Sequence, residues 1–115
     1  MIKTISLKIY QNDKMIESAE SVRCINHDSY IVFSHNNVTN KINKDKYIRE
    51  NDDYQIEFDI NKKTGLLLLK KEQLNFDLPI DILTYQEEDN KITLISKLQE
   101  DKDTTKLEIE IKEVS

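Results

Sequence analysis

The chain has 115 residues, enough for one domain, so we predict that residues 1–115 form a single domain. Apolar residues make up 37% of the chain and charged residues 34%, a balance that is typical of a globular protein and argues against disorder. The formal net charge is −5, whereas nucleic-acid binders usually carry a basic surplus, so no nucleic-acid partner is expected. No apolar run exceeds four residues, far below the roughly twenty of a membrane-spanning helix, so no membrane partner is expected.

Alternation of apolar and polar residues predicts β-strands along most of the chain. Near the N-terminus Ile5, Leu7 and Ile9 alternate with other residues, and no secretory signal is expected there. The next strand, about 15–25, changes parity, which predicts a bulge near 19–21. The range 41–51 has the best helical pattern, but its apolar residues are poorly spaced, so no helix is predicted. Further strands are predicted at 30–33, 54–60, 66–69, 74–82, 90–98 and 107–111.

Turns are predicted at Asn and Asp residues, because the chain has one glycine and one proline. These signals recur at intervals of about 8 to 15 residues, which is typical of an antiparallel all-β domain. The segments are 12–13, 26–28, 36–37, 43–45, 51–53, 61–65, 87–90 and 100–103.

The predicted architecture is a small antiparallel meander β-barrel of about eight strands. Closure into a barrel removes the exposed strand edges that would otherwise promote aggregation. The alternation over 74–82 continues through Pro79, which predicts one strand bent at its middle, with the proline at an edge, bulge or corner. The lysines at 62, 63, 70 and 71 flank an apolar run, either as edge protection or as a basic patch formed across one hairpin.

This order of segments resembles the YwiB-like (DUF1934) family of small bacterial calycin-type barrels. The resemblance covers an N-terminal strand pair, the strand 29–33, the hairpin at 64–66, the strand 90–98 and the strand 107–111. It implies an eight-stranded, lipocalin-like barrel in the bacterial cytoplasm, and it supplies no catalytic residues. The single cysteine, Cys24, independently indicates a reducing, cytoplasmic environment, because it has no partner for an internal disulfide.

No constellation of residues predicts catalysis or a cofactor. Cys24, His27 and His35 are too few for a structural zinc site, which needs about four ligands, so no metal is predicted. Cys24 is expected to be a small core residue and not a nucleophile, with both histidines in loops. The acidic clusters at 50–53 and 87–89, and the one at 100–103, are expected to be solvated turns. The protein is therefore predicted not to be an enzyme.

The predicted barrel interior leaves two functions open. A barrel of about eight strands can be filled by side chains or hold one small ligand. Large aliphatic residues dominate the inward positions without a convergent polar group, which favours a filled core. If a ligand is bound, it is expected to be small and apolar, in a void above about 300 Å³. The residues predicted to bind it are Ile56, Phe58, Leu74, Phe76, Leu94 and Leu107.

The second possible function is that of an interaction or dimerising module with a filled core and no ligand. In that case a protein partner, or a second copy in a homodimer, would contact the outer face. Aromatic residues are enriched at the centres of such contacts, and those of Tyr10, Tyr47 and Tyr85 that are exposed are the predicted anchors.

Overall fold

The computed structural model describes residues 2–27 and 29–114, with side chains at 3–26 and 29–112. This part of the chain forms eleven antiparallel strands in one sheet. No helix long and apolar enough to cross a membrane occurs within it. The strands are β1 (Ile2–Gln11), β2 (Lys14–His27), β3 (Tyr30–His35), β4 (Val38–Ile42), β5 (Lys46–Glu50), β6 (Tyr54–Asp59), β7 (Thr64–Leu69), β8 (Leu74–Leu78), β9 (Ile80–Glu88), β10 (Lys91–Leu98) and β11 (Thr105–Val114).

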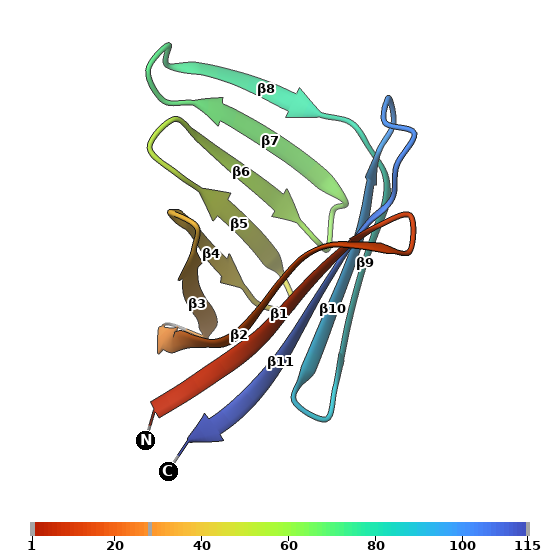
Figure 1. Cartoon of the computed structure of the whole chain (residues 1–115). Helices are drawn as coiled ribbons and strands as arrows, with labels where there is room; N and C mark the ends of the chain where they lie inside the picture. The colour runs from red at the N-terminus through yellow and green to blue at the C-terminus, as the bar shows by residue number, and fades with distance from the viewer. Residues whose placement is uncertain (1, 28, 115) are drawn as a thin grey trace.

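The sheet is a meander that curls into a nearly closed barrel (Figure 1). The strand order is β8-β7-β6-β5-β4-β3-β2-β1-β11-β10-β9, so β1 lies between β2 and β11. The two edges, β8 and β9, are consecutive in the chain but are not paired with each other. The all-β antiparallel prediction is therefore confirmed, and the sheet stays open along one line.

The prediction of about eight strands is wrong, because the sheet has eleven. The segment with the weak helical pattern, 41–51, contains the end of β4 and all of the short strand β5. The side chain of Asn43 accepts hydrogen bonds from the backbone N–H groups of Asp45 and Lys46, both at 2.8 Å, and so reverses the chain between them. Asn51 does the same for the two backbone N–H groups at 53 and 54 before β6. Asn side chains thus separate strands that are too short to show a clear period.

The chain changes from one edge of the sheet to the other at Pro79. The predicted strand 74–82 is split there into the whole of β8 and the start of β9. Proline has no N–H to donate, but its carbonyl accepts a 2.9 Å hydrogen bond from the backbone N–H of Gln99. The predicted corner at Pro79 is confirmed, whereas its two flanks belong to opposite edges instead of one bent strand.

Local irregularities follow the turn chemistry of the sequence. In β2, Ala19 pairs with Leu7 and Val22 with Ile5, so the predicted bulge lies between them, with Ser21 at φ 56°. Left-handed pairs form the turns at 12–13, 36–37 and 89–90, where Asn and Asp tolerate positive φ. The turn between β7 and β8, with Gln73 at φ 54°, has no Asn, Asp or Gly and was not predicted.

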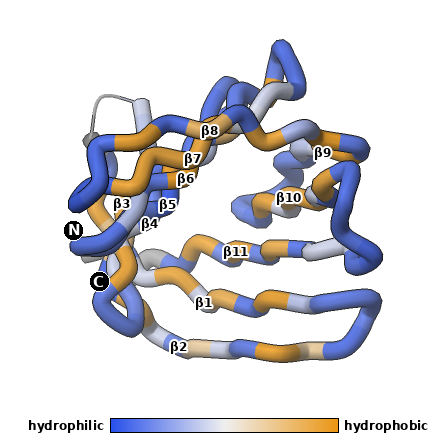
Figure 2. The backbone as a smooth tube through the Cα atoms, turned by 90° about the horizontal axis from the view of Figure 1, so that it is seen from above, coloured by the Kyte–Doolittle hydropathy of each residue, from blue (hydrophilic) through white to orange (hydrophobic). Residues whose placement is uncertain are grey.

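The hydrophobic core lies on the concave side of the sheet. Figure 2 shows apolar and polar residues alternating along β1 and β11, which pair over their whole lengths. Ile5, Ile42, Ile92 and Ile109 are fully buried. Cys24 belongs to the same buried cluster, which confirms its prediction as a core residue.

Candidate functional site

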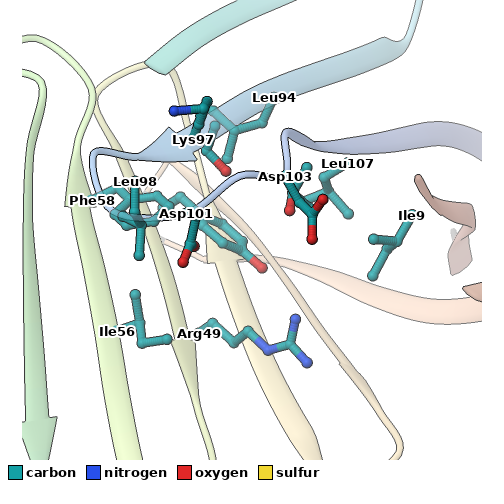
Figure 3. A pocket seen from close by; sticks show the side chains of 13 residues that line it. Ile9, Arg49, Ile56, Phe58, Leu94, Lys97, Leu98, Asp101, Asp103 and Leu107 are labelled. Carbon is teal, nitrogen blue, oxygen red and sulfur yellow. The ribbon is translucent and has the colours of Figure 1, made fainter. Parts of the chain in front are cut away.

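A cavity of about 210 Å³ lies inside the barrel, between β5 and β6 on one side and β1, β10 and β11 on the other (Figure 3). The loop between β10 and β11 also contributes to it. The interior is therefore not solid, although the cavity is smaller than the predicted 300 Å³. Its lining residues are Ile9, Tyr47, Arg49, Ile56, Phe58, Leu94, Ser96, Lys97, Leu98, Asp101, Asp103, Thr105 and Leu107.

Four of the six residues predicted to bind a ligand meet at this cavity: Ile56, Phe58, Leu94 and Leu107. The other two, Leu74 and Phe76, do not line it and are 49% and 46% exposed. Phe76 pairs with Leu67, and Leu67 with Ile56, so Phe76 shares the concave face of the sheet. It is exposed because β8 is an edge strand with no partner on its other side.

Arg49 is the charged group that points from β5 into this interior. It pairs directly with Asn40 on β4 and Ile56 on β6, and opposed residues of antiparallel strands share a face. Its Nε is buried and has no hydrogen-bond partner. None of the ion pairs formed among the described side chains includes Arg49. An unsatisfied buried donor costs about 1–3 kcal/mol, and more when it is charged.

Tyr47 lies two residues before Arg49 on the same face. Its hydroxyl donates a 2.7 Å hydrogen bond to Oδ1 of Asn40, and both side chains are only 7% exposed. Burial raises the pKa of Tyr47 to about 12, against the opposing effect of the nearby Arg49 charge. The ring of Tyr47 packs against Phe58 with centroids 6.2 Å apart. Tyr47 is thus a neutral, fixed wall of the cavity.

Glu17 on β2 lines a small space together with Arg49, but its contacts are with other side chains. Its Oε1 accepts a 2.9 Å hydrogen bond from Nδ2 of Asn36 and lies 3.6 Å from Nε2 of His35. These contacts tie β2 to the turn between β3 and β4. A small space of about 30 Å³ separates this group from Arg49 and Asn40.

The rim of the cavity is held by polar contacts across the barrel end. Asp103 accepts hydrogen bonds from the side-chain amides of Gln11, at 2.8 Å, and Asn12. Lys97 donates a 3.2 Å hydrogen bond to Asp81. Asp101 and Asp103 are exposed, and Figure 3 places their carboxylates beside the cavity.

The predicted interface tyrosines are not all available at the surface. Tyr47 is buried, so it is not one of the exposed tyrosines that could anchor an outer-face contact. Tyr85 is half-buried; its hydroxyl donates to Glu87 at 3.2 Å, and burial, followed by that carboxylate, raises its pKa to about 12. Tyr10 lies under the ammonium of Lys106, which is 4.6 Å from the ring centroid.

Cys24 is a poor nucleophile in this structure, because burial raises the pKa of its thiol. The side chain of His27 lies outside the described residues. Elsewhere, over 3–26 and 29–112, no three His, Cys, Asp or Glu side chains gather closely enough to hold a metal ion.

The lysines at 62, 63, 70 and 71 do not form the basic patch that was one of their two interpretations. Lys62 and Lys63 lie in the turn before β7, whereas Lys70 and Lys71 lie in the turn after it, so the two pairs are at opposite ends of that strand. The second pair is also neutralised, because Lys70 contacts Glu50 at 2.9 Å and Lys71 contacts Asp53 at 3.2 Å.

Two other cavities have more polar surroundings. One of about 230 Å³ is lined by Ile31, Ile42 and Ile92 together with six other residues, among them Lys44, Asp45 and Glu87. Another of about 400 Å³ lies on the outer face of the β9–β10 hairpin and is lined entirely by polar side chains. Neither combines a largely apolar lining with a buried donor that lacks a hydrogen-bond partner.

No family model matches the chain, and no curated protein or solved structure is significantly similar to it. The functional argument therefore depends on the side chains of the cavity. Sequence reasoning found its apolar part but missed Asn40, Tyr47 and Arg49. Their shared parity across β4 and β5 becomes visible only when 38–50 is read as two strands.

Proposed function

We propose that this protein is a lipocalin-like, non-enzymatic binding protein that holds a small apolar ligand inside its barrel. The main support is the cavity of about 210 Å³ lined by apolar side chains of β1, β6, β10 and β11. Concave sites with largely apolar linings are typical of small-molecule binding. A cytoplasmic location and membership of the YwiB-like family are parts of the same proposal.

The volume limits the size of the ligand. A cavity of about 150 Å³ holds benzene, so the larger space here suits a molecule somewhat bigger than benzene, such as one short alkyl chain. Ligands of this size have few atoms to contribute binding energy, so we expect dissociation constants in the micromolar to millimolar range.

Filling the cavity tests this proposal. Ser96 lines it from β10, and Ser96→Leu places a larger apolar side chain in the space. Thr84→Leu is the matched control, because Thr84 is exposed on β9. We expect calorimetric titration with 1-octanol to detect binding to the parent protein and to Thr84→Leu, and a loss of at least tenfold in Ser96→Leu. Equal binding by all three proteins would place the ligand elsewhere.

The alternative is a homodimer or a complex formed through the open edge. It is favoured by Leu74 and Phe76, which are about half exposed on the unpaired strand β8. An edge strand can pair with another chain, and apolar side chains beside it add contact area. Light scattering after size exclusion tests the homodimer. The dimer mass in the parent protein and the monomer mass in Phe76→Glu would support it, whereas a monomer at all concentrations would exclude it.

A further inference from the structure

We propose that the ligand is an amphiphile with one carboxylate head group, which Arg49 binds, and a short apolar tail that occupies the rest of the cavity. This inference rests on the proposed function and names the chemical class of its ligand. It is carried by the buried Nε of Arg49, which has no hydrogen-bond partner, inside a largely apolar space.

The Nε of Arg49 lacks a hydrogen-bond acceptor. It is buried without a partner, and a buried donor that is left unsatisfied costs stability. The Tyr47 hydroxyl donates to Asn40, and Glu17 accepts from Asn36 across a small space from Arg49, so neither is hydrogen-bonded to this Nε. A carboxylate entering the cavity would supply the missing acceptor, and the planar fork of arginine matches two carboxylate oxygens.

The surroundings of Arg49 select an apolar tail. Ile56 is its direct neighbour on β6, and Figure 3 shows Leu98 and Phe58 on the same side of the cavity. Leu94, Leu107 and further apolar side chains complete the lining opposite β5. A ligand whose charge lies at Arg49 therefore has its remaining surface in contact with apolar side chains.

The rim selects a single negative charge. Asp101 and Asp103 lie at the cavity with exposed side chains, and the chain carries a net charge of −5. Their repulsion toward one carboxylate is weakened by water and salt, whereas the attraction of the more buried Arg49 is screened less. The rim cation, Lys97, is paired with Asp81. Phosphates and other polyanions would meet this acidic rim with several charges and are therefore disfavoured.

The experiment compares octanoate with 1-octanol, which have the same chain length and differ in charge, by calorimetric titration at pH 7.5. The variants are Arg49→Gln, which removes the interior charge, and Lys91→Gln, which removes a charge from the outer face, where Lys91 contacts Glu108. We expect octanoate to bind the parent protein at least tenfold more tightly than octanol. Arg49→Gln should weaken octanoate at least tenfold more than it weakens octanol, and Lys91→Gln should change neither.

The outcomes separate this inference from the proposed function. If octanol binds and Arg49→Gln leaves octanoate affinity unchanged, the carboxylate inference is overturned and the apolar site stands. If neither ligand binds the parent protein, both are overturned. Retained octanol binding in Arg49→Gln also demonstrates that the variant is folded, so a selective loss of octanoate supports the assigned role of Arg49.

Discussion

The two walls of the barrel differ in length, pairing and chemistry. The first wall, β1, β10 and β11, has strands of eight to ten residues, and the inward residues Ile5, Ile92 and Ile109 are fully buried. The second wall, β4 to β8, has strands of five or six residues. Its inward face carries Arg49 and ends in the half-exposed Phe76 at an unpaired edge.

The difference indicates a division of roles. Buried apolar side chains contribute most to stability, and here they lie on strands that are paired on both sides. Interior polar groups and an open edge contribute less or cost stability, but they provide the specific contacts that a ligand needs. We therefore expect substitutions in the first wall to affect unfolding most, and substitutions at Arg49 to affect binding most.

The largest effect is expected for Ile109→Ala in the first wall. Ile109 is 0% exposed, so its truncation leaves a cavity and should lower the free energy of unfolding by about 2–5 kcal/mol. Phe76→Ala in the second wall removes more atoms, but from a half-exposed side chain, and should cost less, about 1 kcal/mol. Urea denaturation measures both. An equal or larger cost for Phe76→Ala would mean that β8 is covered in solution.

The second largest loss of stability is expected for a substitution at Gly65, on β7 in the second wall. A Cβ at Gly65 would lie 3.0 Å from Cβ of Leu78 and 3.1 Å from Cδ1 of Ile80. Gly65→Ala must displace β8 or these side chains and should cost about 1–3 kcal/mol. Thr64→Ala, at the exposed neighbouring position, should stay within about 0.5 kcal/mol. Equal unfolding midpoints for the two variants would contradict the close approach of Leu78 and Ile80.

The third effect is alkaline destabilisation through Tyr47. Its pKa is raised from 10.0 in the unfolded chain to about 12 in the fold. The unfolded state therefore loses this proton first, and the stability that is present below pH 10 is lost as pH rises toward 12. The loss should reach roughly 1–2 kcal/mol.

Denaturation at pH 8 and about pH 11 measures this loss. Tyr47→Phe should be less stable than the parent protein at pH 8, because the Asn40 hydrogen bond is removed, and should lose less stability at the higher pH. Identical pH dependence in both proteins would exclude Tyr47 as the titrating group.

The smallest expected effect is an increase in stability, whereas the three effects above are losses. Arg49→Met removes an unpartnered buried donor and should raise the stability of the ligand-free protein by about 1 kcal/mol. Arg23→Met, at an exposed position on β2, is the control and should change stability by less than about 0.5 kcal/mol. A loss of stability in Arg49→Met would show that the protein itself supplies a partner for this guanidinium.

Sequence patterns predicted the fold better than they predicted the site. Strict alternation at 54–60 and 107–111 indicated strands because those residues lie between an apolar core and water. The same rule failed at 38–50, where Asn40 and Arg49 point inward and break the apolar period. The inward polar groups beside the cavity thus removed the signal that would have located their strands.

The strand edges could not be predicted either. The alternation over 74–82 is continuous, and nothing in it distinguishes a bent strand from two strands at opposite edges. That distinction depends on hydrogen bonds to distant segments, such as the one from the Gln99 N–H to the Pro79 carbonyl.

The central claim is that the space between the two walls binds a short amphiphile with its carboxylate at Arg49. Methyl NMR spectra recorded during a titration with octanoate test it most directly. We predict shifts for the methyl groups of Ile56, Leu94 and Leu107, and none for Ile16 and Ile25, which are exposed on β2. Unchanged interior methyl groups at saturating octanoate, or shifts confined to the exposed residues, would contradict the claim.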